Sequence, residues 1–340
     1  MNVHELPLIA FTILAQMCVG AFVVLGIIQL LGPRLLPDNE LRAEVAERSG
    51  EPTTWVGRAL ARLHLERAPA ATRTDRLTDP VLFAIGPVLV LGLLGSMAHL
   101  GNPFNALNTF RHLSTSWLSR EILFGCLFAG LGFLFAFLQW MKWGSARLRQ
   151  VVAGLTALVG LGLVYVMSMV YASLPTVPAW NLWTTPATFY VTTFLLGCLA
   201  VGAALMTVTM WRRKHLGEEV AIDVATQRAL TRVLRAIAVA AAALAVVQVV
   251  LLVLQLTTMA ADPQMPVASA QALYTNVFLV RLILLILGAC LLGFFLYRAS
   301  LRERSLTLIA TVATSAFVVV LVSEVLGRSL FYDTMTRIGM

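Results

Sequence analysis

The sequence predicts an all-α integral membrane protein, a bundle of eight transmembrane helices with both termini on the outer side. The first observation is composition, because 59% of the 340 residues are hydrophobic and only 12% are charged. So few charged side chains could not cover the surface of a soluble domain. The second observation is the recurrence of long apolar runs along the sequence. The third is an uneven distribution of Lys and Arg among the connections between these runs.

The apolar runs give the expected helices of a single membrane domain covering residues 1–340. A spanning helix needs roughly 20 mostly apolar residues. The qualifying windows, in sequence order, are 8–31, 81–98, 119–139, 150–173, 186–209, 231–258, 272–297 and 306–326. These runs are apolar on every face, whereas barrel strands alternate, so a β-barrel is excluded. No positively charged segment precedes the first window, which we therefore assign as a membrane helix and not as a cleaved signal peptide.

The basic residues orient this bundle. With an even number of helices, the connections 32–80, 140–149, 210–230 and 298–305 all lie on the side opposite the termini. Together with their flanks they hold 20 of the 25 Lys and Arg residues. Cytoplasmic loops carry this excess of positive charge, so both termini are predicted to face outward. The net charge of +8 thus reflects membrane topology, and we do not expect nucleic acid as a partner.

Two further features concern the membrane surfaces. The long cytoplasmic loop 32–80 contains an amphipathic stretch at 54–67, which fits either a helix lying on the leaflet or a solvated loop with a marginal helix. Five tryptophans fall near the expected helix ends and are predicted to form an interfacial aromatic belt. They are Trp140, Trp143, Trp180, Trp183 and Trp211.

Polar side chains within the apolar windows gather toward one face of the membrane. Each such group costs a few kcal/mol in hydrocarbon and needs a partner or a purpose. A rise of about 1.5 Å per residue places the following in the outer half: Gln16, His99, Glu121, Ser168, Tyr171, Gln255, Arg281, Glu324 and Arg328. The inner half offers little beyond Gln29 and Gln139. We expect Arg281 to pair with Glu121 or Glu324, and Glu324 with Arg328 to form an i, i+4 ion pair.

The segment from His99 to Glu121 is the strongest candidate for chemistry. A titratable imidazole and a carboxylate flank one short connection, at the depth of an amphipathic ligand's head group. A quinol that gives up two electrons also gives up two protons, and His and Glu are suitable acceptors for them. None of the five histidines lies inside an apolar window, which argues against haem. We expect no haem, iron–sulfur cluster or metal in this protein, so electrons would pass to another subunit.

Several motifs carry a resemblance to a known family. They are His99-Leu-Gly-Asn-Pro103 with Asn108, Glu121-Ile122, Tyr171, Thr176-Val-Pro-Ala-Trp180, Arg281, and Ser323-Glu-Val-Leu-Gly-Arg328 with Phe331-Tyr332. In these stretches, spread along nearly the whole length, the sequence resembles the membrane anchor subunit (the C subunit) of the anaerobic dimethyl sulfoxide reductase family.

The resemblance implies a multi-pass anchor in the bacterial inner membrane, with both termini periplasmic, that binds and oxidises menaquinol. It also implies two periplasmic partners, a four-cluster iron–sulfur subunit and a molybdopterin catalytic subunit. The implied quinol-binding residues are His99, Gly101, Pro103, Asn108, Glu121, Tyr171 and Arg281. Glu324 and Arg328 are then an ion pair or the edge of the site.

Two other interpretations remain open from the residues alone. A secondary transporter would bind its substrate near the bilayer midplane between inverted repeats. Here the polar groups lie toward one face and no repeat is visible. A purely structural anchor without a quinol site is the third interpretation, and a quinol-analogue binding assay separates it from the first.

Overall fold

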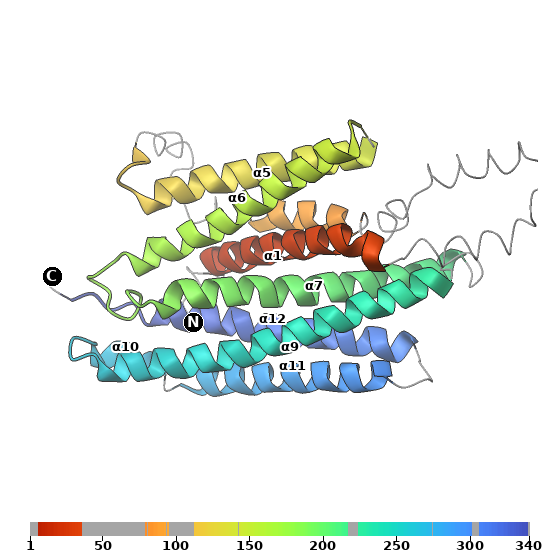
Figure 1. The fold of residues 1–340 in the computed structure, drawn as a ribbon. Helices are drawn as coiled ribbons and strands as arrows, with labels where there is room; N and C mark the ends of the chain where they lie inside the picture. Colours follow the sequence, from red (N-terminus) through yellow and green to blue (C-terminus); the bar gives the residue numbers. More distant parts are fainter. Residues whose placement is uncertain are drawn as a thin grey trace, which may run out of the picture.

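The bundle is helical throughout the part of the protein that can be described. The computed structural model describes residues 6–35, 79, 81–92, 94, 112–141, 143–216, 224–273, 275–300 and 306–338, and these contain no strand. The helices are α1 (Leu6–Leu35), the short Val81–Gly92 helix, α5 (Trp117–Met141), α6 (Ala146–Ala172), α7 (Thr184–Leu216), α9 (Val224–Ala261), α10 (Val267–Leu273), α11 (Asn276–Ser300) and α12 (Leu306–Asp333). Figure 1 shows the long helices lying side by side.

Six of these helices are long and apolar enough to cross a membrane, so this is a multi-pass membrane protein. They are α1, α5, α6, α7, α9 and α12. The bent pair of α10 and α11, with 44° between the two axes, would make a seventh span. The Val81–Gly92 helix is apolar but shorter, and most of the rest of its predicted window lies outside the described residues. Each of the eight predicted windows therefore contains a helix, while eight full spans are not established.

Local sequence explains where several helices begin. Gly144 adopts a positive φ of 75° in the tight connection between α5 and α6, a conformation that favours glycine. Ser145 then caps α6 by accepting a hydrogen bond from the backbone N–H of Leu148. Pro186 lies in the first turn of α7, where its missing N–H costs no helical hydrogen bond.

One end of the bundle, which we call the α10 end, brings together distant parts of the sequence. There α1, α5, α7 and α11 begin and α6, α9 and α12 end (Figure 1). The Ser269 hydroxyl of α10 donates to the carbonyl of Thr334, at 2.9 Å, just after α12. The N–H of Ile338 donates to the carbonyl of Thr176, also at 2.9 Å, in the connection between α6 and α7. These contacts tie the last described residues to the α10 end.

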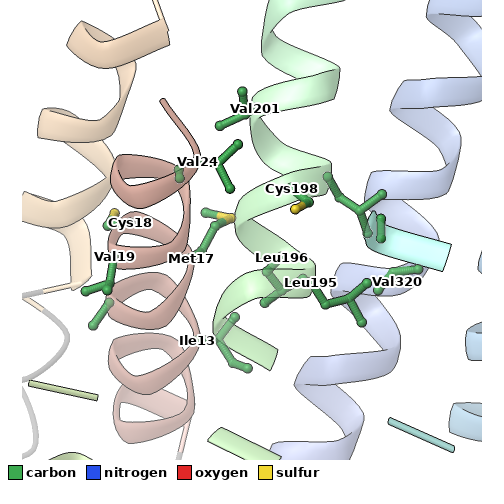
Figure 2. Packing of buried hydrophobic residues seen from close by; sticks show 14 of the residues in the cluster. Ile13, Met17, Cys18, Val19, Val24, Leu195, Leu196, Cys198, Val201 and Val320 are labelled. Atoms are coloured by element: carbon green, nitrogen blue, oxygen red, sulfur yellow. The ribbon is translucent and has the colours of Figure 1, made fainter. Parts of the chain in front are cut away.

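The core is built around α7, which packs against α1, α6, α9 and α12. Figure 2 shows Ile13 and Met17 of α1 facing α7, and Val320 of α12 on the other side of α7. The closest approach is at Gly20 of α1 and Gly197 of α7. A Cβ on Gly197 would lie 2.6 Å from the Cα of Gly20, and one on Gly20 would overlap the carbonyl oxygen of Thr193. Small residues at this crossing let the two backbones touch.

The predicted aromatic belt is correct for four of its five tryptophans. Trp140, Trp143, Trp183 and Trp211 are all exposed near helix ends. Trp180 is the exception, because only 6% of its surface is exposed and it packs inside the α10 end. The interfacial prediction failed for Trp180 because a position near a helix end does not determine the direction of the ring. The connection after α6, which carries Trp180, folds inward.

Candidate functional site at the α10 end

A cluster of aromatic side chains lies just inside the α10 end. It consists of Tyr171, Trp180, Phe189, Phe331 and Tyr332, contributed by α6, the connection after it, α7 and α12. The hydroxyls of Tyr171 and Tyr332 are hydrogen-bonded at 3.0 Å. The Trp180 indole stacks on Phe331, with 5.4 Å between ring centroids, and its Nε1 donates to the Phe331 carbonyl at 2.8 Å. The two tyrosine hydroxyls thus form a polar contact inside an apolar ring cage.

Arg328 lies against this aromatic cluster and links three helices. Its guanidinium carbon is 3.8 Å from the centre of the Phe189 ring, a cation–π contact. Its Nη2 donates to Gln16 Oε1 of α1 at 3.0 Å. Gln16 in turn donates to the carbonyl of Phe189 at 3.2 Å. Gln16 is therefore an interhelical bridge, and Arg328 has partners on α1 and α7, away from its own helix.

A small polar cavity lies beside Arg328, between α7, α9, α11 and α12. Its volume is about 40 Å³, room for a few water molecules, and Glu324 and Arg281 both line it. Glu324 Oε2 accepts hydrogen bonds from Thr192 Oγ1 at 2.6 Å and from Gln248 Nε2 at 3.4 Å. Glu324 Oε1 and Arg281 Nε are buried without a hydrogen-bond partner in the described part of the protein. Buried polar atoms of this kind are usually completed by water.

Gly327 makes room for the buried guanidinium of Arg281. A Cβ at position 327 would lie 2.5 Å from both Cζ and Nε of Arg281. The Ser323 hydroxyl donates to the Arg281 carbonyl at 2.9 Å and fixes α11 against α12 one turn away. The position of Arg281 thus depends on a small residue at 327.

Glu121 of α5 is a second buried carboxylate near the aromatic cluster. Its side chain is only 7% exposed, although it stands in the second turn of α5. It is within electrostatic range of both Tyr171 and Tyr332. The turn before α5 is held by Arg120, which donates to the carbonyls of Leu113 and Ser114 at 2.8 and 2.7 Å. The two buried carboxylates, Glu121 and Glu324, balance the formal charge of two buried arginines, Arg281 and Arg328.

The structure tests the predicted site only in part. His99, Gly101, Pro103 and Asn108 lie outside the described residues. Glu121 is within electrostatic range of Tyr171, and whether the two bind a quinol stays a prediction.

The contacts of the remaining predicted residues are with one another's surroundings on α1, α7, α9 and α11. Arg281 shares a cavity with Glu324, and that cavity is also lined by Phe331 and Arg328 of the aromatic side. Glu324 and Arg328 direct their hydrogen bonds to other helices, so they do not form the simple pair within one helix that their spacing predicted.

Sequence reasoning missed four partners of these residues. Trp180 was assigned to the interface, and Tyr332, Thr192 and Gln248 were given no role. Gln248 and Thr192 had a usable signal, because both are polar residues inside apolar windows of the outer half. Tyr332 had none of its own, since a tyrosine near a helix end is ordinarily interfacial.

Comparison with known proteins now decides the family. The profile of the DMSO reductase anchor subunit (DmsC) matches residues 71–334, more than three quarters of the sequence. The protein belongs to the DMSO reductase anchor subunit family. Among curated relatives, the C subunit of the anaerobic dimethyl sulfoxide reductase of Escherichia coli (strain K12) is 26% identical over 338 residues, covering 99% of this sequence and 97% of the relative.

Two further relatives agree with this assignment. The C subunit of the anaerobic dimethyl sulfoxide reductase of Haemophilus influenzae is 30% identical over 230 residues, covering 66% of this sequence and 67% of the relative. The YnfH subunit of an E. coli anaerobic dimethyl sulfoxide reductase is 26% identical over 345 residues, covering 99% of this sequence and 97% of the relative. The matched region includes Glu121, Tyr171, Arg281 and Arg328, so the α10 end lies within the anchor-subunit homology.

Proposed function

We propose that this membrane anchor binds menaquinol at the α10 end, oxidises it, and passes the electrons to an iron–sulfur subunit of a DMSO reductase-like complex. A molybdopterin subunit would then reduce the terminal acceptor. The proposed quinol-binding residues are His99, Gly101, Pro103, Asn108, Glu121 and Tyr171, and Arg281 supports the site from the neighbouring cavity. The observation that carries the proposal is a buried carboxylate, Glu121, beside a hydrogen-bonded tyrosine pair in a member of the anchor-subunit family.

The proposed topology has eight spans, with the α10 end and both termini on the periplasmic side. The excess of Lys and Arg in the opposite connections supports this orientation. The Val81–Gly92 helix would be part of the second span, and α10 with α11 would form the seventh. The α10 end would then be the surface on which the iron–sulfur and catalytic subunits dock.

Quinol oxidation requires only proton acceptors from this protein. Oxidation of one quinol to quinone breaks two O–H bonds and releases two protons and two electrons. In the proposed site Glu121 accepts one hydroxyl proton and His99 the other, and both protons leave to periplasmic water. The electrons leave on the same side to the iron–sulfur subunit, so the step moves no net charge across the membrane. The scheme requires no haem, cluster or metal in the anchor itself.

In this scheme Arg281 does not contact the quinol ring. It lies with Glu324 in the small cavity on the other side of Arg328, where it balances a buried carboxylate. Its contribution would be to hold α11 and α12 in register, and through Arg328 to keep the aromatic cluster in place. Arg328 and Glu324 thus form the edge of the proposed site.

The proposal is tested by substitution in the assembled complex. Glu121→Gln and His99→Asn should each lower quinol-dependent reductase activity by about a hundredfold, the size of a lost general base. Activity with a soluble artificial electron donor should stay at the wild-type level, because that donor bypasses the quinol. His112→Asn is the matched control, since His112 is an exposed histidine just before α5. If the two site variants keep wild-type quinol activity, the quinol does not bind at these residues.

A further inference from the structure

A large apolar groove opens on the membrane-facing side of the bundle, between α1, the Val81–Gly92 helix and α5. Its volume is about 580 Å³. One wall is formed by Phe133 and Ala136 of α5 and the other by Phe83 and Pro87 of the short helix. The floor is Phe22 of α1, which packs edge-on against Phe128 and Phe135, with ring centroids 6.2 and 5.5 Å apart.

The groove lies on the same face of α5 as Glu121. Phe128 and Gly132 follow Glu121 by seven and eleven residues, and both separations return to within roughly 20° of the same direction on an α-helix. Both residues line the groove. At a rise of about 1.5 Å per residue, the groove begins some 10 Å below Glu121 along the helix and ends about 22 Å below it at Ala136.

Between Glu121 and the groove, this face of α5 has a position without a side chain, Gly125. Gly125 lies one turn below Glu121 on this face and is buried, yet a Cβ placed on it would meet no atom within 4 Å. A side chain at this position would ordinarily fill that space. The Val81–Gly92 helix, which forms the opposite wall, also precedes His99 in the sequence by only a few residues. One wall therefore belongs to the helix that carries Glu121, and the other belongs to a helix that ends seven residues before His99 in the sequence.

We infer that this groove holds the polyprenyl tail of the quinol whose head group lies at Glu121. The inference rests on the proposed function and adds a tail subsite to it. The groove lining is almost entirely apolar, as an isoprenoid tail requires, and its α5 residues run from Phe128 to Ala136, away from the helix end that carries Glu121. A phospholipid acyl tail would suit the same lining, but nothing in its chemistry would place it in line with a buried carboxylate.

The groove orients the quinol tail and adds little hydrophobic transfer free energy to binding. A tail that moves from lipid into this groove exchanges one hydrocarbon environment for another, so little transfer free energy is gained. Its effect is to hold the tail in one direction, and thereby to present the head group to Glu121. Filling the groove should consequently obstruct long-tailed quinols and leave a tailless quinol unaffected.

The test uses the intact complex in nanodiscs and two substrates, long-tailed menaquinol and a tailless naphthoquinol. Ala136→Phe places a ring in the groove and should raise the KM for menaquinol about tenfold, the effect of overpacking a fitted site. Its KM for the tailless naphthoquinol should stay at the wild-type value. Gly130→Phe is the matched control, because Gly130 is exposed on the opposite face of α5 with no atom within 4 Å of its Cβ position. That control should change neither KM.

Each other outcome has a definite meaning. Equal KM values for wild type and Ala136→Phe with menaquinol would overturn the tail subsite and leave the groove to lipid. A KM raised equally for both substrates would also overturn it, because the head-group site would then be distorted. If the wild-type complex oxidises neither quinol, the proposed function itself fails.

A second measurement uses a menaquinone with a photoreactive group near its tail end. Labelling of residues 83–90 or 132–136 supports the subsite, and labelling elsewhere refutes it.

Discussion

Arg328 offers the sharpest test of how the α10 end is held together, and Arg328→Gln is the perturbation. The variant removes the hydrogen bond to Gln16, which spans 3.0 Å and joins α12 to α1. It also removes the guanidinium that lies 3.8 Å from the centre of the Phe189 ring. Both contacts are buried, since only 7% of Arg328 is exposed.

The expected magnitude follows from these two contacts. A hydrogen bond to a charged group contributes about 1.5–3 kcal/mol, and a desolvated cation–π contact about 2 kcal/mol. Removing the buried charge relieves part of its own desolvation cost, which offsets some of this loss. We expect Arg328→Gln to lower the free energy of unfolding by about 2–3 kcal/mol. Arg328→Lys keeps the charge but loses the flat stacking surface, and should cost about half as much.

The assay is reversible unfolding of the purified protein in mixed micelles, read as a double-mutant cycle with Gln16→Leu. Because Arg328 and Gln16 share one hydrogen bond, their coupling energy should be about 1–2 kcal/mol. The same cycle with Thr156→Val, whose buried hydroxyl donates to the Val152 carbonyl within α6, should give no coupling to Arg328. A coupling energy between Arg328 and Gln16 within about 0.3 kcal/mol of zero would refute this account of the cluster.

Two further predictions concern contacts described above. Gly197→Ala should lower the free energy of unfolding by about 1–3 kcal/mol, because its Cβ would meet the backbone of Gly20. The control is Gly26→Ala, whose Cβ has open space. Equal stability of the two variants would contradict the close crossing of α1 and α7. Tyr332→Phe should cost about 1 kcal/mol by removing the hydroxyl bonded to Tyr171. In the same unfolding assay the double variant with Tyr171→Phe should cost little more than either single variant, and fully additive costs would argue against the bond.

Helix positions could be predicted from the sequence because the length and hydropathy of an apolar run determine where a membrane helix lies. Every predicted window contains a helix, and the windows differ from the observed bounds mainly at the ends, where α7 and α9 run on past the apolar region. The number of full spans was less predictable. The break between α10 and α11 falls at residues 274–275, and hydropathy alone does not indicate a bend there.

Sequence reasoning placed several buried polar residues toward one end of the helices, but it did not give their partners. Depth along the helices placed Gln16, Arg281 and Glu324 at one end, because the rise per residue is fixed. Their partners depend on which helices are neighbours, and spacing within one helix gives no information on that. Glu324 therefore looked like a partner of Arg328, whereas the packing of α7 and α9 around α12 supplies Thr192 and Gln248.

The reliance of the polar cluster on α12 has a consequence for biogenesis. This helix follows all the other described helices in the sequence, yet it provides Glu324 and Arg328. Glu324 accepts hydrogen bonds from α7 and α9, and Arg328 donates one to α1. During translation, Gln16 and Arg281 must enter the bilayer before these partners exist. An arginine in a spanning segment costs roughly 2.5–3.5 kcal/mol on insertion scales, which the surrounding leucines and valines of α11 can offset. The hydrogen bonds that join α1, α7 and α9 to Glu324 and Arg328 thus form only after α12 has been synthesised.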